Sequence, residues 1–425
     1  MNVVIIGGGS AGSTCAFELR KLNKDVNINI LESTSYYEYS PCALPYVISK
    51  EIESLEKIYI YDRKDYEANN INLMLNSKVY EIDFVNKKVF FNDDEFIKYD
   101  KLVIATGAKP FVPKIENLDE YLTLKTPNDV RAIEEAISRN DKFLIVGGGM
   151  VGVEVAEAIN KRDKDVTIIE SSSHLLSSML DSDMSKILKE KLLEDGIKVL
   201  ENERLEMYSK DLGKVILCTG VIPNDNFLLS KNKGYVVSNK LETNIKDVYA
   251  CGDVVNSTNA ITKEKFLSGL GTTAVRQGIL VARNILEFDE SFEEVLNNTI
   301  SKISNLYVGS VGVTSLDCKN NNITSVTSKA KSPVRAHYYS REEQIVVKLI
   351  VSMEYKILGA QIIGDAEVSG RLNLLALAIS EGIDVKRLSK LETCYNPASA
   401  AIFDPITVAC NTVIKKIDAL KKRGV

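Results

Sequence analysis

Two stretches of the chain share one pattern of hydrophobic and polar positions. The first, NVVIIGGGSAGSTCAFELRKL, begins at Asn2, and the second, KFLIVGGGMVGVEVAEAINKR, begins at Lys142. Each starts with a run of apolar residues, continues through three glycines and ends with apolar residues at helical spacing. This succession predicts a buried strand, a tight turn and a helix. The repeat therefore predicts two α/β lobes of similar construction.

Both turns carry the spacing GxGxxG directly after the predicted strand. The glycines are Gly7, Gly9 and Gly12 in the first copy and Gly147, Gly149 and Gly152 in the second. The first two glycines allow a tight turn and a close approach of backbone to a pyrophosphate, and the third lets helix and strand pack. A second apolar strand ends at Glu32 in one lobe and at Glu170 in the other, where a carboxylate can bind ribose hydroxyls. Two dinucleotide sites are expected. Glu170 favours NADH, and NADPH stays open if an arginine distant in sequence approaches.

Further along the chain, two apolar stretches end in residues that suit the edge of a nucleotide site. YDKLVIATGAKP leads into Thr106 and Gly107, and TNIKDVYACGDVV ends at Gly252 and Asp253. A helix is predicted over 266–286, and it includes Ala274. The last hundred residues alternate like strands and then carry an apolar helix, without a nucleotide motif. The predicted fold is α/β, with two dinucleotide-binding lobes and a C-terminal α+β domain.

The composition narrows the class of partner and the cell compartment. The 425 residues carry a net charge of −5, which argues against nucleic acid as a partner. No apolar run approaches the roughly 18 residues that cross a bilayer, and the chain enters its first strand without a signal peptide. Seven cysteines lie scattered without CxxC spacing, which argues against metal sites and against a secreted disulfide framework. We therefore expect a cytoplasmic protein that binds no membrane and no metal.

One cysteine stands apart from the others. Cys42 lies between two prolines in EYSPCALPYVI, soon after the first glycine turn. The residue five positions later is Val47, so the sequence excludes a CxxxxC pair at this place. An isolated cysteine is most often a small buried residue. The rigid, proline-flanked position leaves a reactive thiol as the alternative.

Together, the two glycine turns, the Thr106 and Asp253 stretches and the C-terminal segment resemble the pyridine nucleotide-disulfide oxidoreductase family. The resemblance covers nearly the whole chain. It implies FAD in the first lobe and NADH in the second, with Thr106, Gly107, Asp253 and Ala274 lying against the flavin. It also implies that the C-terminal domain forms a homodimer. The expected parts are 1–113 and 243–318 for the FAD domain, 114–242 for the NADH domain and 319–425 for the dimerisation domain.

The stretches SPCALPYVI and ETCYNPASAAIFDP narrow the resemblance to a subgroup with one redox-active cysteine. That subgroup contains coenzyme A disulfide reductases, NAD(P)H persulfide or polysulfide reductases and NADH oxidases. It implies that Cys42 is a nucleophile with a lowered pKa, and that Tyr395 reaches the site from the partner subunit. Residues expected near a thiol substrate, with coenzyme A among the possible ligands, are Ser40, Arg20, Arg63 and Phe403.

The chain also departs from this subgroup. Glu38 stands where a serine is common, and Ser399 stands where a second aromatic residue is common. Ser10 stands where the peroxidases of the group have a histidine, which disfavours peroxidase activity. Reduction of coenzyme A disulfide, persulfide or polysulfide is the favoured activity. An NADH oxidase that reduces oxygen and an NADH-dependent electron-carrier reductase remain open alternatives.

Overall fold

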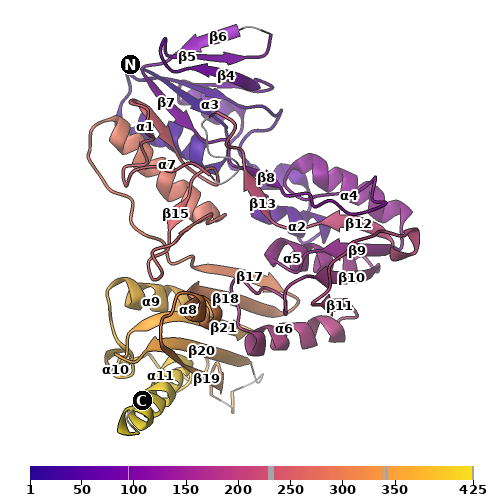
Figure 1. The fold of residues 1–425 in the computed structure, drawn as a ribbon, viewed down its shortest axis with the longest axis vertical. Helices are drawn as coiled ribbons and strands as arrows, with labels where there is room; N and C mark the ends of the chain where they lie inside the picture. The colour runs from indigo at the N-terminus through magenta and orange to yellow at the C-terminus, as the bar shows by residue number, and fades with distance from the viewer. Residues whose placement is uncertain (94, 228–233, 337, 340–342, 424–425) are drawn as a thin grey trace.

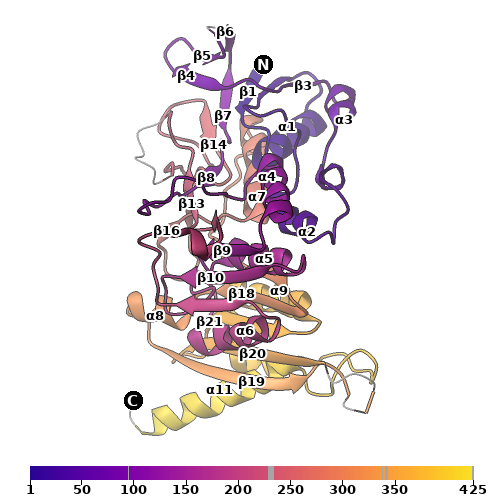
Figure 2. The same cartoon turned by 90° about the vertical axis from the view of Figure 1, so that its right-hand side faces the viewer.

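The computed structural model describes residues 1–425 except 94, 228–233, 337, 340–342 and 424–425. Figure 1 shows three bodies: a first lobe at the top that carries the N-terminus, a second lobe to its right, and a C-terminal domain at the bottom. The two chain ends lie at opposite extremes of the molecule (Figure 2). This arrangement confirms the predicted class of two α/β lobes and a C-terminal α+β domain.

The first lobe is built on a parallel sheet of order β14-β7-β1-β2-β3. Its strands are β1 (Asn2–Ile6), β2 (Asn27–Leu31), β3 (Ile71–Met74), β7 (Lys101–Ile104) and β14 (Val248–Ala250). Its helices are α1 (Ser10–Leu22), α3 (Arg63–Ala68) and α7 (Gly271–Ile285). Val3 and Ile5 pack with the helices, whereas Val4 and Ile6 pack on the opposite face. The continuous apolar run of β1 is explained because both faces of the strand are buried.

A small antiparallel sheet covers that opposite face. Its strands are β4 (Val79–Asp83), β5 (Lys88–Phe91) and β6 (Glu95–Lys98). Val89 and Phe91 of β5 join Val4 and Ile6 in one core. The first lobe therefore has three layers, with the parallel sheet in the middle.

The second lobe repeats the parallel arrangement in the order β11-β10-β9-β12. Its strands are β9 (Lys142–Val146), β10 (Asp165–Glu170), β11 (Lys198–Glu201) and β12 (Lys214–Leu217). Its helices are α4 (Pro127–Arg139), α5 (Met150–Asn160) and α6 (Ser182–Glu194). Thr126 caps α4 in a reciprocal box with Asp129, and Pro127 occupies the first turn, which explains where that helix begins.

The chain enters and leaves the second lobe along one short antiparallel pair. These two strands are β8 (Ala108–Pro110) and β13 (Val221–Pro223). Beyond β13, the buried Tyr235 packs into the first-lobe core with Val4 and Ile6. The return to the first lobe therefore precedes the expected border at 242/243.

The C-terminal domain has an antiparallel sheet of order β17-β18-β21-β20-β19. Its strands are β17 (Thr299–Ile303), β18 (Leu306–Gly312), β19 (Ser325–Pro333), β20 (Gln344–Ser352) and β21 (Ile357–Gly364). Its helices are α8 (Ser315–Asn320), α9 (Val368–Ser380), α10 (Val385–Leu388) and α11 (Pro405–Lys422). β17 and β18 precede the expected border at 318/319, yet β18 pairs along β21. Strand pairing thus puts the start of the C-terminal domain near Thr299, where β17 begins. The sequence did not indicate this start, because short strands carry little hydrophobic pattern of their own.

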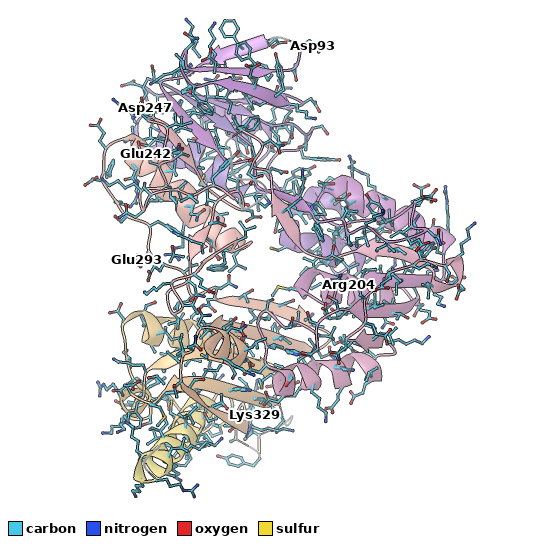
Figure 3. All side chains as sticks on the ribbon, in the orientation of Figure 1. Asp93, Arg204, Glu242, Asp247, Glu293 and Lys329 are labelled. Atoms are coloured by element: carbon cyan, nitrogen blue, oxygen red, sulfur yellow. The ribbon has the colours of Figure 1, made fainter. Side chains whose placement is uncertain are left out.

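Polar side chains join the second lobe to the C-terminal domain. Lys348 of β20 is almost fully buried, and its Nζ lies 2.7 Å from Asp181 Oδ2 and 2.5 Å from Asp183 Oδ1 at the start of α6. Lys329 of β19, labelled in Figure 3, adds a contact of 3.0 Å to Asp183. The backbone N–H of Asp181 donates to Gln361 Oε1 at 2.9 Å. This junction rests on charge pairs as well as on apolar packing.

The remaining elements are short. They are η1 (Pro41–Ala43), α2 (Leu44–Ile48), η2 (Leu55–Ile58), η3 (Lys210–Leu212), β15 (Ser257–Thr258) and β16 (Lys265–Phe266). The helix predicted over 266–286 begins only at Gly271, because Phe266 pairs in β16. Within the described residues, every helix is too short or too polar to cross a membrane.

Candidate active site

The first glycine turn shapes an open backbone surface where α1 begins. Gly7 adopts a φ of +104°, and a Cβ there would lie 2.3 Å from the carbonyl oxygen of Ala105. A Cβ on Gly12 would lie 2.0 Å from the Gly7 carbonyl oxygen, so both positions exclude any side chain. Around Gly9, by contrast, nothing lies within 4 Å. The turn therefore offers free backbone at the positive end of α1, which suits a pyrophosphate.

Glu32 fixes the other side of this turn. Its Oε2 accepts the backbone N–H of Gly8 at 2.8 Å, and its Oε1 accepts that of Thr34 at 2.7 Å. The carboxylate thus lies at the carboxyl end of β2, beside the glycine turn. This is the position from which a carboxylate can accept ribose hydroxyls.

Thr106 and Gly107 lie where β7 runs into β8. Thr106 Oγ1 donates to the Asn224 carbonyl oxygen at 2.7 Å, and Asn224 Nδ2 donates back to the Thr106 carbonyl oxygen at 2.9 Å. The N–H of Asn224 reaches the Gly107 carbonyl oxygen at 2.8 Å. The two crossings between the lobes are therefore tied together beside the first nucleotide site.

Asp253 and Ala274 come from the second passage of the chain through the first lobe. Asp253 follows β14 and lies 3.5 Å from Lys125 Nζ. Gly252 has a φ of +82° and donates its N–H to Gln277 Oε1 of α7 at 2.7 Å. A Cβ on Gly252 would lie 3.0 Å from Ala11 and 4.0 Å from Ala274. The β14 end, α1 and α7 thus meet at one place.

These features fit a bound FAD. The close contacts at Gly7 and Gly12, the open surface at Gly9 and the ribose-side carboxylate of Glu32 belong to one turn. Asp253 reaches the same edge of the sheet from β14, which lies beside β7. The residues that could hold the dinucleotide are those that meet at this edge: Gly7, Gly9, Gly12, Glu32, Thr106, Gly107, Asp253 and Ala274.

The second glycine turn has the same backbone conformation and the same close contacts as the first. Gly147 has a φ of +109°, and a Cβ on Gly152 would lie 1.9 Å from the Gly147 carbonyl oxygen, while Gly149 is open. Glu170 accepts the N–H groups of Gly148 at 2.6 Å and of Ser172 at 2.5 Å. Burial opposes ionisation of Glu170, but these hydrogen bonds outweigh it and lower the pKa of the carboxyl. An anionic acceptor at this position suits a ribose 2′-hydroxyl rather than a 2′-phosphate.

Cys42 lies in η1, which continues directly into α2. All seven cysteines of the chain are free thiols, and Cys42 is one of two that are exposed. The segment before it is fixed by the N–H of Ser40, which donates to the Ile58 carbonyl oxygen at 2.9 Å. Pro45 lies in the first turn of α2. The structure thus presents the thiol on a rigid, exposed turn, with Ser40 two residues away.

The surroundings of Cys42 do not favour the thiolate. Burial of its sulfur against neighbouring groups raises the pKa of the thiol, and the Glu154 and Asp253 carboxyls raise it further. The Lys125 ammonium and a hydrogen bond from the Cys42 backbone oppose them without reversing the direction. α2 has five residues, so its dipole adds little. The expected lowering of the pKa is therefore not provided by the protein groups of this subunit.

Glu154 is a neighbour of the site that the sequence analysis missed. It lies in α5, one turn beyond the second glycine turn, and accepts Ser301 Oγ of β17 at 2.5 Å. Burial raises the pKa of this carboxyl to about 7. Its charge also raises the pKa of the Tyr46 hydroxyl in α2. Glu154 is one of two glutamates in the GVEVAEA stretch, and nothing in that pattern distinguishes it from a surface residue.

Tyr395 and Phe403 lie in the loop before α11, in the C-terminal domain. Both are exposed, and the Tyr395 hydroxyl lies 3.0 Å from that of Tyr338. This hydrogen bond raises the pKa of Tyr395. Within the described part of one subunit, no hydrogen bond joins Tyr395 to the Cys42 turn. The sequence analysis did not single out Tyr338, because its contact with Tyr395 spans 57 positions.

The two arginines expected at a thiol substrate differ sharply. Arg20 is buried and uses all five of its N–H groups, to the carbonyl oxygens of Asn23, Lys24, Val26, Asn69 and Asn70. Arg20 therefore links α1 to the residues that precede β2 and follow α3. With all its donors used in this way, it does not fit the expected place at a thiol substrate. Arg63 is exposed and pairs with Glu67 at 2.6 Å. In one subunit Arg63 is therefore a surface residue, and its expected place near a thiol substrate stays a prediction.

The comparisons with known proteins agree with this geometry. Residues 1–278 match the model described as pyridine nucleotide-disulphide oxidoreductase, and residues 300–404 match the dimerisation domain of the same family. The chain belongs to the pyridine nucleotide-disulphide oxidoreductase family. Its members use FAD and NAD(P)H. Both are dinucleotides, and the open backbone of the two glycine turns suits a pyrophosphate.

Individual relatives carry several activities in their names. The chain is 36% identical to an NADH oxidase of Methanocaldococcus jannaschii, over 98% of this chain and 99% of that one. It is 30% identical to an NAD(P)H coenzyme A polysulfide/persulfide reductase of Pyrococcus horikoshii, over 96% and 97%. The structure of an NAD-dependent persulfide reductase from A. fulgidus superposes with a TM-score of 0.94 at 29% identity, covering 99% of this chain and 84% of that one.

Proposed function

We propose that this protein transfers electrons from NADH through FAD to a disulfide, persulfide or polysulfide, with Cys42 as the reacting thiol. The observation that carries the proposal is the free, exposed Cys42 on a rigid turn of the first lobe. The names of the relatives from Pyrococcus horikoshii and A. fulgidus support a sulfur substrate. Coenzyme A as part of that substrate belongs to the same proposal.

Each cofactor is assigned to one glycine turn. Gly7, Gly9, Gly12 and Glu32 hold the FAD, and Gly147, Gly149, Gly152 and Glu170 hold the NADH. When bound, FAD accepts a hydride from NADH and returns two electrons to a disulfide. The anionic Glu170 makes NADH the preferred donor over NADPH.

Cys42 attacks one sulfur of the substrate as a thiolate and forms a mixed disulfide, and the second sulfur leaves as a thiolate or sulfide. Lys125 is the cation that favours ionisation of Cys42. Tyr395, paired with Tyr338, approaches from the partner subunit of a homodimer, and Phe403 and Ser40 line the substrate path. The proposed setting is the cytoplasm, where cysteines stay reduced, in keeping with seven free thiols.

Anaerobic single turnover tests this proposal. The FAD-loaded enzyme is reduced with NADH and then mixed with coenzyme A disulfide or with polysulfide, while flavin absorbance is recorded. Reoxidation is expected with at least one sulfur compound and is lost in Cys42→Ser. Cys394→Ser removes the other exposed thiol and serves as the control, with wild-type reoxidation. A Cys42→Ser enzyme that keeps full sulfur turnover would refute the proposal.

A second candidate function is the reduction of oxygen. It is supported by the 36% identity to a relative named NADH oxidase. Another relative, 30% identical, is named NADH-rubredoxin oxidoreductase, which supports an electron carrier as acceptor. Oxygen uptake in step with NADH loss, independent of added sulfur compounds, would select the oxidase. Rapid reduction of rubredoxin by Cys42→Ala would select the carrier reductase.

A further inference from the structure

A buried carboxyl lies beside the first glycine turn, and the proposed reaction does not yet use it. Glu38 is 5% exposed and precedes Cys42 by four residues. Its carbonyl oxygen accepts the N–H of Ile60 at 2.8 Å, and the following Ser40 N–H donates to the Ile58 carbonyl oxygen. These hydrogen bonds fix the backbone on both sides of Glu38, and the side chain of Glu38 is buried.

The carboxyl reaches the first turn of α1. It lies beside the hydroxyl groups of Ser10 and Ser13, which partly offset the effect of burial on its pKa. The Ser13 hydroxyl is already engaged, because it donates to the Gly8 carbonyl oxygen at 2.8 Å and lies 2.9 Å from the Tyr66 hydroxyl. Glu38 Oε2 is buried and has no hydrogen-bond partner among the described residues. A polar atom left without a partner in this way is costly unless a ligand or a proton satisfies it.

Among the described residues, no cation acts on the Glu38 carboxyl. Tyr61, in the loop before α3, and Tyr66, in α3, lie near it: burial raises the pKa of both hydroxyls, and the Glu38 charge raises it further. Tyr61 in turn stacks on Phe17 of α1, with ring centroids 4.0 Å apart. Burial raises the pKa of the Glu38 carboxyl to about 7. Near neutral pH this carboxyl therefore both holds and releases a proton.

We propose that Glu38 is the proton store of the sulfur reaction and delivers its proton, through the Ser10 hydroxyl, to the thiolate that leaves when Cys42 attacks a disulfide. Ser10 is the first residue of α1, is half-buried and follows the exposed Gly9. Its hydroxyl hydrogen-bonds to the Glu38 carboxyl, so it contacts the buried acid at the edge of the open glycine turn. This inference rests on the proposed function. It names a proton donor within the subunit, in addition to Tyr395 of the proposed dimer.

The step balances as follows. The Cys42 thiolate forms an S–S bond with one substrate sulfur, and the original S–S bond breaks with its electron pair on the leaving sulfur. Ser10 gives its hydroxyl proton to that sulfur and takes the Glu38 proton, so that a neutral thiol leaves and Glu38 becomes a carboxylate. Water restores the proton. Glu38 acts through Ser10, and its effect depends on how much the leaving sulfur needs a proton.

Substrates with different leaving groups test this dependence. An alkyl disulfide such as coenzyme A disulfide releases a thiolate of high basicity, whereas 5,5′-dithiobis(2-nitrobenzoate) releases an aromatic thiolate that needs no proton. We expect Glu38→Gln to slow reoxidation of the NADH-reduced enzyme by the alkyl disulfide on the order of 10²-fold. Its rate with the aromatic disulfide stays within twofold. A purely structural role of Glu38 would slow both substrates equally.

The pH profile gives a second readout. Ionisation of Cys42 affects both disulfides alike, so it cancels in the ratio of the rate with the alkyl disulfide to the rate with the aromatic disulfide. Because Glu38 donates in its protonated form and burial raises its pKa to about 7, this ratio falls in the wild type as pH rises through about 7. Glu38→Gln and Ser10→Ala both lose this fall. Glu51→Gln is the control, since Glu51 lies just beyond α2, which Glu38 precedes, and is paired with Lys161 and Lys302. It leaves the leaving-group dependence and the pH profile unchanged.

The outcomes separate the inference from the function on which it rests. Full sulfur turnover by Cys42→Ser overturns the proposed function, and the proton store with it. Loss of turnover in Cys42→Ser, with equal effects of Glu38→Gln on both disulfides or none on either, overturns the proton store alone. If Glu38→Gln does not retain FAD, Ser10→Ala is the deciding variant. The inference is then contradicted if Ser10→Ala changes the rates with both disulfides by the same factor, relative to the wild type, across the pH range.

Discussion

The two nucleotide lobes share one turn and differ in what covers it. Gly7 and Gly147 have φ values of +104° and +109°, and a Cβ on either would meet a carbonyl oxygen at 2.3 or 2.4 Å. In each lobe a glutamate accepts the N–H of the middle glycine, at 2.8 Å for Glu32 and 2.6 Å for Glu170. The turn therefore defines the type of ligand, a dinucleotide, in both lobes alike.

The cover explains why the lobes need not behave alike. In the first lobe α7 packs directly on α1, and a Cβ on Gly278 would lie 2.4 Å from the Ala11 carbonyl oxygen. In the second lobe α5 packs against α2 of the first lobe and β17 of the C-terminal domain instead. In the first lobe, the packing of α7 on α1 favours a cofactor that stays bound. In the second lobe, the glycine turn lies at a junction between domains, which favours a ligand that binds and leaves in each cycle. The following changes test this contrast, from the largest expected effect to the smallest.

Lys348→Met tests the attachment of the second lobe. The change leaves the buried Asp181 facing an apolar side chain, which costs about 3 kcal/mol of unfolding free energy. Thermal unfolding should show a lower transition temperature, and FAD content should stay unchanged. Lys329→Met is the control, because Lys329 is far more exposed and exposed pairs contribute less than about 1 kcal/mol. Equal losses in both variants would show that burial of the pair is unimportant.

Gly278→Ala tests the cover of the first turn. The added methyl group meets the Ala11 backbone, so α7 must move away from α1 at a cost of about 2 kcal/mol. The purified variant should contain less FAD, while NADH affinity of the loaded fraction is kept. Gly370→Ala in α9 is the matched control, since nothing lies within 4 Å of that position. Wild-type FAD content in Gly278→Ala would remove the basis of the contrast.

The paired variants Glu32→Gln and Glu170→Gln test the two ribose positions separately. Loss of a charged hydrogen-bond acceptor costs about 1.5 kcal/mol, which corresponds to roughly tenfold in affinity. Glu170→Gln should raise the KM for NADH about tenfold and narrow the preference over NADPH. Glu32→Gln should weaken FAD and leave the KM for NADH alone. The assignment of cofactors to lobes fails if these two effects are exchanged.

Acid should loosen the junction of the second lobe before the core of the first. Burial opposes ionisation of Asp183, but hydrogen bonds from Lys348 and Lys329 outweigh it and lower its pKa. A carboxyl with a lowered folded-state pKa stabilises the fold above its unfolded value of about 3.9, and this contribution is lost as pH falls further. The protection factors of the α6 and β20 amides, which correct hydrogen exchange for its intrinsic pH dependence, should therefore fall below about pH 4. Lys348→Met should show a smaller change, and an unchanged pH response would contradict this origin.

The sequence predicted the parts of the site that depend on local pattern. Each glycine turn with its glutamate lies within about thirty residues, so spacing alone identified them, and the proline-flanked Cys42 was evident for the same reason. Arg20 shows the opposite case. The sequence analysis places it near a thiol substrate, yet its partners in the fold include Asn69 and Asn70, which are 49 and 50 positions away. Contacts of that range are invisible to periodicity.

The same limit explains the pKa of Cys42 and the domain borders. Glu154 and Asp253, which raise the pKa of Cys42, come from other parts of the chain, and only the fold brings them near. The expected border at 318/319 differs from the strand pairing because β18 belongs to a sheet that β21 completes about fifty residues later. Glu38 was noticed only as a departure from a common serine, because burial of a lone carboxyl leaves no trace in the pattern around it.

The antiparallel pair of β8 and β13 has a consequence for modularity. The entry and exit of the second lobe lie side by side, hydrogen-bonded over three positions, while β1, β7 and β14 are neighbours in a sheet that the inserted segment does not interrupt. An excision between Pro110 and Val221 would leave ends already in register, as would a graft of another nucleotide-binding module. The β8–β13 pair is therefore the seam for such an exchange, and a grafted module must also replace the packing of α5 on α2 and the pairing of Asp181 with Lys348.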